Sequence, residues 1–291
     1  MSALFERQAG VATTAQLLHL MSRRQLQQLR NAAVLEHIWR GVYSLGPADI
    51  TTRLRALDLT SGTDVAICLN TAARAWGFDT ENRSDLHVLN PEGHQLRPVP
   101  GLVVHRRDGA PLRRVAGRLT TAPAWTAVEV ARALPRPRSL ATLDAALRSG
   151  QCNRAGLSNA VTAQTGRRGI VRVRELLTFA DGRAESPMES EARLVMIDGA
   201  LPTPALQYEV RDAGGRLRRL DFAWPDQMVA AEYDSDQWHA GTDALRRDRE
   251  KVAALQDLGW IVVPIVRDDV RRRQHALVNR IRAHLDRASA A

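Results

Sequence analysis

The sequence predicts a mixed α/β protein of several domains, and three observations lead to this prediction. Its 291 residues are enough for two or three separate hydrophobic cores. Helical periodicity and short apolar runs alternate along the chain instead of forming one continuous pattern. A polar stretch containing Gly and Pro, ADGRAESP, interrupts the helical patterns at residues 180–187. We therefore expect domains at residues 1–50, 51–183 and 184–291.

Residues 3–45 have the pattern of three helices followed by a hairpin. Thr13 or Thr14 can cap a helix through TAQLLHL. Ser22 and Gln25 have the spacing of a capping box at the start of the next helix, SRRQLQQLRNAAV. The short LMS segment between these helices is typical of a helix-turn-helix.

The helix that begins at Ser22 has an apolar side and a polar side. Leu26, Leu29 and Ala33 would form its buried stripe. The side chains left exposed are types that contact base edges and phosphates: Arg23, Arg24, Gln27, Gln28, Arg30 and Asn31. We expect this face, with Arg40 of the following hairpin, to bind DNA. Any short helical bundle can carry a similar polar face, so the alternative is a solvated surface.

Two apolar strands follow in LEHIWRGVYSL and meet at Arg40-Gly41, a suitable tight turn. Three helices and a β-wing in this order predict a winged helix-turn-helix. The stretches RQAGVATTAQLL and IWRGVYSL resemble the N-terminal winged helix of AbiEi-type antitoxins from type IV toxin–antitoxin systems. The resemblance covers residues 1–50 well and the next stretch more weakly. It implies a repressor of its own operon and a cognate toxin encoded nearby.

Residues 62–135 predict a small α/β unit with the strands DVAICL, DLHVL and LVVHRR. His87, His94 and His105 have the spacing of strand and loop positions rather than of a metal triad, so we expect surface or hairpin roles for them. No catalytic constellation is evident in this unit. Helical patterns then follow at 123–133, 139–149, 154–164 and 169–180.

The charge of the chain favours a nucleic-acid partner. The formal net charge is +9, and Lys251 is the only lysine among the 41 basic residues. The planar guanidinium of arginine grips phosphate oxygens in two places, which suits a phosphate-rich partner. A GC-rich genome also favours arginine codons and accounts for the ratio of arginine to lysine, but it does not account for the net charge.

The cysteines and the N-terminus indicate a cytoplasmic protein that does not enter a membrane. Cys68 and Cys152 are far apart and outside any Cys/His cluster, so the sequence indicates neither a disulfide framework nor a zinc module. Glu6 and Arg7 lie where a signal peptide needs an apolar core. No apolar run approaches the about 18 residues of a membrane-spanning helix.

After Pro187 the pattern changes to a helix, three strands, a helix and a further strand. The helix is MESEARLVMIDGA, and the strands are expected near 205–210, 216–224 and 228–234. A helix at 241–258, the strand WIVVPIV and a last helix at 270–287 complete the chain. This α-β-β-β-α-β order is that of the PD-(D/E)XK core of restriction-endonuclease-like proteins.

Four acids fall where such a core would use them: Glu189, Asp221, Glu232 and Asp234. An unpaired carboxylate among apolar strand residues is costly, so these acids should be paired, protonated or bound to a cation. Alternation places Glu232 and Asp234 on one face. Asp221 joins them if the hairpin loop has an even number of residues, for example 224–227, which sets Asp221 opposite Ala230.

Converging carboxylates are ligands that Mg²⁺ or Mn²⁺ prefers. We expect Asp221 and Glu232 to bind such an ion directly, with Glu189 bound through water or orienting the attacking water. Asp234 would be a supporting acid. The expected reaction is hydrolysis of a nucleic-acid phosphodiester by metal-activated water.

Several stretches in the same order resemble the very short patch repair (Vsr) endonucleases over residues 185–290. They are SPMESEARL, RLDFAWP, VAAEYDSDQWH and RRDREKVAALQDLGWIVV. This Vsr-like resemblance implies that Asp221 binds metal. It also implies that His239, directly after Trp238, helps to activate the attacking water.

One departure from the superfamily pattern leaves the activity open. The superfamily has a lysine two residues after the third-strand acid, and Asp234 stands at that position here. His239 as the base, with Arg247 and Lys251 supplying positive charge, could replace the lysine. The alternative is a non-catalytic antitoxin or transcriptional autoregulator with a degenerate nuclease fold. In a third interpretation the acids are surface residues paired with arginines: Arg218, Arg219, Arg246 or Arg247.

Overall fold

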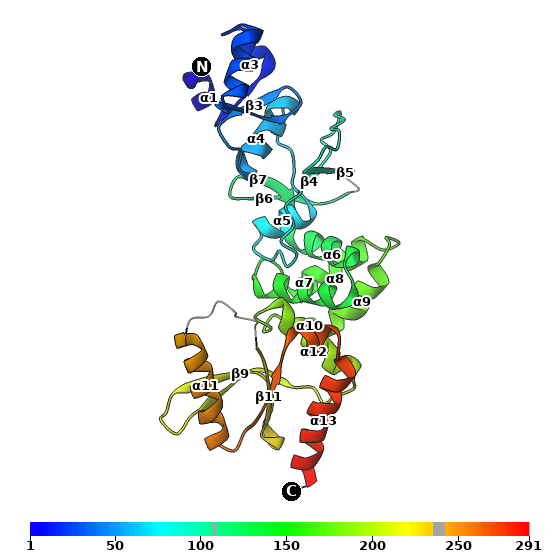
Figure 1. Cartoon of the computed structure of the whole chain (residues 1–291). Coiled ribbons are helices and arrows are strands. Elements are labelled where there is room, and N and C mark those ends of the chain that lie inside the picture. The colour runs from blue at the N-terminus through cyan, green and yellow to red at the C-terminus, as the bar shows by residue number, and fades with distance from the viewer. Residues whose placement is uncertain (107–108, 235–241, 291) are drawn as a thin grey trace. The chain divides into compact units, whose positions relative to one another are not determined.

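In the computed structural model the chain divides into two compact units (Figure 1). The first unit is Met1–Trp76 with Glu81–Ala122, and the second is Gly77–Thr80 with Pro123–Ala291. The structure describes residues 1–106, 109–234 and 242–290, without the side chains of residues 242–248. Helices and small sheets alternate within these residues, so the predicted mixed α/β class is confirmed. The predicted limits of the three domains stay a prediction.

The first unit begins with short helices and a small antiparallel sheet. The elements are α1 (Ser2–Arg7), β1 (Val11–Thr13), α2 (Thr14–Leu18), α3 (Arg23–Asn31), β2 (Leu35–Trp39) and β3 (Val42–Leu45). The predicted order of three helices and a hairpin is present, and the hairpin turns at Arg40-Gly41. Strand β1 was not predicted, because three residues are too few to show alternation; it pairs with β3 in the order β1-β3-β2.

Capping residues fix where α2 and α3 begin. Thr13, not Thr14, caps α2, since its hydroxyl accepts a hydrogen bond from the Gln16 N–H at 3.2 Å. Ser22 and Gln25 form the predicted capping box: the Gln25 N–H donates to the Ser22 hydroxyl, and the Ser22 N–H donates to Gln25 Oε1. Each cap satisfies N–H groups that the first helical turn leaves without an intrahelical partner.

The buried side of α3 is shorter than predicted. Leu26 is buried in a cluster with Phe5, Leu17 and Tyr43, and Leu29 packs against this cluster while partly exposed. The prediction for Ala33 was wrong, because α3 ends at Asn31. Ala33 follows the helix in a left-handed conformation with φ of +52° and is exposed.

The rest of the first unit consists of two helices and two pairs of strands. They are α4 (Ile50–Ser61), α5 (Leu69–Ala75), β4 (Leu86–Leu89), β5 (Leu102–His105), β6 (Leu112–Val115) and β7 (Arg118–Thr121). Strands β4 and β5 are parallel, and β6 and β7 form a hairpin. The predicted strand DVAICL forms only a bridge at Ile67, which pairs with Val88 and Thr120, because α5 begins at Leu69.

Helices dominate the first part of the second unit. They are α6 (Pro123–Ala133), α7 (Arg136–Arg148), α8 (Arg154–Ala163), α9 (Ile170–Phe179) and α10 (Pro187–Asp198), close to the predicted ranges. A buried ion pair joins α10 to α7. The Arg193 guanidinium lies 2.6 Å from Asp144 Oδ2, with side-chain exposures of 7% and 0%. Asp144 also accepts a hydrogen bond from the Asp181 N–H, so the segment between α9 and α10 is attached to the same carboxylate.

A four-stranded sheet follows in the predicted α-β-β-β-α-β order. Its elements are β8 (Ala205–Arg211), β9 (Leu217–Trp224), the short helix η1 (Pro225–Gln227), β10 (Val229–Tyr233), α11 (Thr242–Asp257) and β11 (Ile261–Ile265). Helices α12 (Arg267–Arg271) and α13 (Gln274–Ala290) complete the chain. The sheet order is β11-β10-β9-β8, with β10 and β11 parallel and the other pairs antiparallel.

Two apolar clusters lie on the two faces of this sheet. Phe222 and Ala231 pack with residues of α10 and α13, whereas Ala223 and Ala230 pack with Leu255 of α11. In Figure 1, α11 and α13 accordingly lie on opposite sides of the sheet. The sheet is therefore covered on both faces, and polar groups in its strands need partners there.

Candidate nucleic-acid interface and carboxylate cluster

The polar face of α3 is exposed as the sequence predicts. Its members are Arg23, Arg24, Gln27, Gln28, Arg30 and Asn31, and none of them is buried. The first turn of the helix contains no acidic residue. The partial positive charge at a helix N-terminus therefore adds to the charges of Arg23 and Arg24 and favours an anion such as phosphate. Arg40, in the hairpin turn, is exposed as well.

Part of this face is held by contacts within the protein. The Gln27 amide donates to Asn31 Oδ1 at 2.8 Å, and the Arg30 guanidinium donates to Gln27 Oε1 at 3.1 Å. The Arg30 guanidinium also lies over the Tyr43 ring, 5.8 Å from its centroid. Arg30 is thus oriented before any ligand arrives, which reduces the entropy cost of binding.

The second candidate site is a cluster of carboxylates at the sheet of the second unit. Glu189 lies in the first turn of α10, which Ser186 caps by accepting from the Glu189 N–H. Asp221 lies on β9 and Glu232 on β10. Three of the four acids proposed from the sequence thus come from three separate elements.

The strand register brings Asp221 and Glu232 together in a way that corrects the expected pairing. The observed pairs Trp224–Val229 and Phe222–Ala231 set Asp221 opposite Glu232, rather than opposite Ala230. The loop has an even number of residues, 225–228, but begins one residue later than expected. The Tyr233 N–H donates to Asp221 Oδ2 at 2.9 Å, and the Asp221 N–H donates to Glu232 Oε1 at 3.2 Å.

Gln207 on β8 connects Glu189 of α10 to Asp221 of β9. Its amide Nε2 lies 3.0 Å from Glu189 Oε2 and 3.5 Å from Asp221 Oδ1. Gln207 has a φ of +52°, and the pairing of β8 with β9 skips the step between Leu206–Phe222 and Tyr208–Leu220. An irregularity of this kind redirects side chains within a strand.

The apolar side chains show that the strands change face at this irregularity. Leu206 and Phe222 belong to the cluster with α10 and α13, whereas Tyr208 and Leu220 belong to the cluster with α11. Gln207 lies between the two sets. Sequence reasoning missed this residue because it is uncharged; its only signal is an amide within the apolar run of a strand.

Lys251, the only lysine of the chain, reaches this cluster from α11. Its Nζ lies 2.5 Å from Glu232 Oε2, with side-chain exposures of 26% and 19%. Two of the four arginines proposed as partners of the acids pair elsewhere: Arg218 with Asp212 at 2.8 Å and Arg219 with Glu185 at 2.5 Å. The side chains of the other two, Arg246 and Arg247, lie outside the described residues. Among the described side chains, the positive charge that pairs with Glu232 is the lysine ammonium.

Burial raises the pKa of all three acids in the cluster. The pKa of Glu232 rises to about 7, because burial and the charge of Asp221 outweigh the opposing effect of Lys251. Burial also raises the pKa of Asp221, against the hydrogen bond from the Tyr233 N–H. The pKa of Glu189 is raised by burial and by the charge of Asp221. The cluster can thus hold a proton near neutral pH.

The other residues proposed for this site lie outside the cluster or outside the described residues. Asp234 follows the end of β10 and is exposed, and its N–H donates to the Ile265 carbonyl at 2.8 Å. The predicted shared face of Asp234 and Glu232 stays a prediction. Trp238 and His239 lie outside the described residues, as does the side chain of Arg247. The proposed base therefore stays a prediction.

The described acids are held by contacts other than those of a metal ion. Among the residues that the structure describes, no three His, Cys, Asp or Glu side chains meet in a geometry that could hold a metal ion. Glu232 is paired with Lys251, and Asp221 Oδ2 accepts from a backbone N–H. Lysine, amide and backbone groups thus neutralise or solvate these acids in the described structure.

One histidine of the first unit, His87, corrects another expectation. His87 is buried, with 9% exposure, although a surface or hairpin position was predicted. Its Nδ1 lies 2.9 Å from His105 Nε2, and the two rings stack with centroids 5.2 Å apart. Burial lowers the pKa of His105, and the charge of His87 lowers it further. His94 remains exposed.

Comparison with known proteins places the chain among relatives. Residues 65–179 match the family described as the AbiEi antitoxin C-terminal domain. Two uncharacterized proteins of Mycobacterium tuberculosis, from strains CDC 1551 and H37Rv, are each 58% identical over 272 residues. The alignment covers 93% of this chain and 100% of each relative. Within the described residues, no helix is long and apolar enough to cross a membrane.

Proposed function

The chain belongs to the same family as the two mycobacterial proteins, with residues 65–179 matching the AbiEi antitoxin C-terminal domain, and from this premise we propose a DNA-binding, antitoxin-type regulator. The match to the antitoxin domain carries the proposal. It lies in the middle of the chain, whereas the resemblance found in the sequence lay mainly in residues 1–50. The regulator would repress its own operon and counteract a cognate toxin.

The first unit supports a DNA-binding role through the arrangement of its N-terminal elements. The order α1-β1-α2-α3-β2-β3, with the sheet β1-β3-β2, is that expected of a winged helix-turn-helix. In such a domain α3 would enter the major groove, and the β2–β3 turn with Arg40 would contact the backbone. The exposed Arg and Gln side chains of α3 suit phosphates and base edges.

A binding experiment tests this role. Full-length protein is titrated against the DNA upstream of its own coding sequence and against unrelated DNA of equal length, at several salt concentrations. Replacing Arg23 and Arg24 by Ala should weaken binding and make the slope of log K against log salt shallower by about 0.9 for each phosphate that is no longer neutralised. The matched control replaces Arg97 and Arg113 by Ala, which removes the same charge from exposed positions outside α3.

The results distinguish DNA binding through α3 from binding that depends only on the net charge of the protein. Equal reductions of affinity in the α3 variant and in the control would show that binding follows net charge alone, and the placement of the interface would then be wrong. Equal affinity for the upstream and the unrelated DNA would contradict autoregulation.

A second candidate function is metal-dependent hydrolysis of nucleic acid by the second unit. The observation that favours it is the convergence of Glu189, Asp221 and Glu232 at the irregular edge of an α-β-β-β-α-β sheet, the order expected of a PD-(D/E)XK core. Lys251 would supply the positive charge that the superfamily places on the third strand. Binding of Mg²⁺ or Mn²⁺ by Asp221 and Glu232 would require the Lys251–Glu232 pair to open.

Cleavage assays decide this second candidate. Pure protein is incubated with plasmid, single-stranded and mismatched DNA in Mg²⁺ or Mn²⁺, with EDTA as the control. Glu232→Ala and Lys251→Met should each abolish cleavage, whereas Glu209→Gln, an exposed change on β8, should not. Cleavage that persists in EDTA or in Glu232→Ala would come from a contaminant, and the antitoxin-type regulator would remain as the function.

A further inference from the structure

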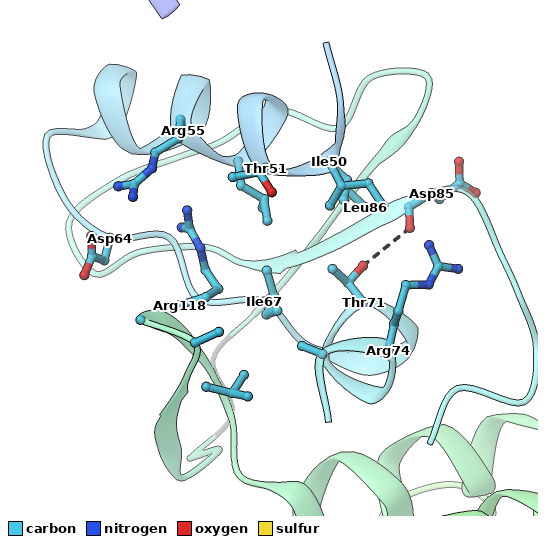
Figure 2. Close-up of a pocket in the computed structure, with 15 residues that line it drawn as sticks. Ile50, Thr51, Arg55, Asp64, Ile67, Thr71, Arg74, Asp85, Leu86 and Arg118 are labelled. Atoms are coloured by element: carbon cyan, nitrogen blue, oxygen red, sulfur yellow. Dashed lines mark hydrogen bonds between the residues drawn. The ribbon is translucent and has the colours of Figure 1, made fainter. Parts of the chain in front are cut away.

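A cavity of about 340 Å³ lies within the first unit, between α4, α5 and the turn that joins β6 to β7 (Figure 2). Its size falls in the range of about 300–1,000 Å³ that small-molecule sites occupy in proteins. Neither the polar face of α3 nor the carboxylate cluster lines this cavity. Its lining nevertheless combines apolar and charged groups in separate places.

The apolar part of the lining belongs to the core of the unit. Three apolar residues line the cavity: Leu54 of α4, Leu86 of β4, and Ile67, which lies outside the strands. All three are buried members of one hydrophobic cluster. The cavity therefore opens onto the core and is more than a hollow between surface side chains. An apolar ligand group that entered it would remove further apolar surface from water, which is favourable.

Charged groups line the cavity on two sides, and one side carries two arginines, Arg55 and Arg118. Figure 2 shows Arg55, Arg118 and Asp64 on one side of the cavity, away from Thr71, Arg74 and Asp85 on the other. The hydrogen bond from Arg114 contributes most to lowering the pKa of Asp64, and the charges of Arg118 and Arg55 lower it further. The guanidiniums of Arg55 and Arg118 therefore lie near the same end of the cavity.

The carboxylates near this end are already paired, but Arg55 is not. Asp64 pairs with Arg114 at 2.5 Å, and Arg118 pairs with Asp58 at 2.9 Å. Arg55 is exposed and makes no ion pair with any residue that the structure describes. An anionic group at this end would find a guanidinium with its donors available, and would not have to displace a carboxylate.

We propose that this cavity binds a small amphipathic anion, with an apolar body against Leu54, Ile67 and Leu86 and one anionic group beside Arg55. A carboxylate, a sulfonate or a phosphate has the required charge and acceptor oxygens. A cation is disfavoured at this end by Arg55 and Arg118. The bound molecule would contact α4 directly.

Helix α4 also supports the small N-terminal sheet. Leu54 and Leu57 share a hydrophobic cluster with Trp39 and Val42 of that sheet, and the Trp39 indole N–H donates to the Arg53 carbonyl at 2.8 Å. The ligand would therefore touch the helix on which β2 and β3 pack.

Two fluorescent probes with nearly the same aromatic body test the proposal. 8-Anilinonaphthalene-1-sulfonate carries an anionic group, and N-phenyl-1-naphthylamine lacks it. Full-length protein is titrated with each probe. Arg55→Gln should weaken binding of the sulfonate about three- to tenfold, because one charge-assisted hydrogen bond is removed at an exposed position, and should leave the neutral probe unchanged.

Two further variants locate the binding site and control for net charge. Ala75→Trp, at an exposed lining position of α5, should fill the cavity and abolish binding of both probes. Arg113→Gln removes the same charge from an exposed position of β6 outside the cavity and should leave both probes bound as in the wild type. Thermal melting of each variant confirms that it is folded.

Three results would overturn the proposal. They are absence of sulfonate binding by the wild type, equal weakening in Arg55→Gln and Arg113→Gln, and unchanged binding of both probes in folded Ala75→Trp. The expected pattern, in contrast, requires both the charge of Arg55 and the space beside Ala75.

Discussion

The exposed face of α3 and the carboxylate cluster, which support the two candidate functions, differ in how they are assembled and in how far they are buried. The α3 side chains are neighbours in the sequence, within residues 23–31, and none of them is buried. The cluster draws on five elements: α10, β8, β9, β10 and α11. Its acids are partly or fully buried, and burial raises the pKa of Glu189, Asp221 and Glu232.

This difference shows how burial determines what a charge contributes. An exposed charge on α3 is screened by water and affects stability little, so it is free to serve a partner. A charge in the covered sheet must be paired or protonated, so each change at the cluster alters the state of its neighbours. Mutations in the cluster should therefore change folding stability, and mutations on α3 should change binding.

The largest expected effect comes from a buried ion pair of α10, the helix that also carries Glu189. Arg193→Met leaves Asp144 buried without its cation and should destabilise the second unit by about 3–5 kcal/mol. The matched change on the exposed helix, Arg24→Met, should cost less than about 0.5 kcal/mol. Urea denaturation followed by circular dichroism measures both values.

A double variant checks that the disturbed charge balance is the cause. Adding Asp144→Asn to Arg193→Met removes the unpaired charge and should restore most of the stability. A destabilisation below about 1 kcal/mol in the single variant would show that burial does not have the energetic role described above.

The next effect is the dependence of stability on pH at Glu232. Its folded pKa is raised from 4.5 to about 7, so its stabilising contribution is fully present below about pH 4.5 and is lost as the pH rises through 7. The wild type should therefore lose about 2–3 kcal/mol relative to Glu232→Gln between pH 4.5 and 7.5. Denaturation curves across this range measure the difference.

An exposed glutamate of the same sheet provides the comparison. Glu209→Gln should follow the wild-type pH profile. If Glu232→Gln also follows the wild-type profile, Glu232 does not have a raised pKa in the folded protein. The cluster and α3 would then not differ in how burial affects their charges.

A smaller effect is expected when one acid of the cluster is made neutral. The charge of Asp221 raises the pKa of both Glu232 and Glu189, so Asp221→Asn should relieve repulsion between the acids. In EDTA at pH 7.5 we expect it to melt at or above the wild-type temperature, with a free energy of unfolding higher by about 1 kcal/mol. If the cluster binds Mg²⁺ or Mn²⁺, the ion should raise the melting temperature of the wild type but scarcely that of Asp221→Asn.

Calorimetry with and without metal distinguishes the outcomes. A decrease in the stability of Asp221→Asn that is the same with and without metal would show that the hydrogen bond from the Tyr233 N–H outweighs the repulsion. That result would exclude the interpretation of the cluster as a metal site.

The smallest effect on stability is expected on the exposed side of the comparison. Arg40→Ala, in the turn between β2 and β3, should change folding stability by less than about 0.5 kcal/mol. It should nevertheless make the salt dependence of DNA binding shallower by about one unit if Arg40 contacts a phosphate. Titrations at several salt concentrations test this, with Arg97→Ala as the control. An unchanged slope would place the hairpin turn away from the DNA backbone.

The sequence by itself determined the local elements and the exposed polar face of α3. The Ser22–Gln25 box, the Arg40-Gly41 turn and the polar face of α3 depend on residues within a few positions of one another, which short-range patterns report. The α-β-β-β-α-β order was also predictable, since each element has its own periodicity. The end of α3 was misplaced because Ala33, just beyond it, takes a left-handed conformation.

Only the tertiary structure decided which distant side chains meet. The irregularity at Gln207, the pairing of Asp221 with Glu232 and the approach of Lys251 depend on strand register and on where α11 packs. The same holds for the contact between His87 and His105, which lie on two parallel strands. Alternation describes a regular strand, and β8 and β9 stop being regular where their apolar side chains change face. A register is fixed by the burial of whole strands at once, so no local pattern can report it.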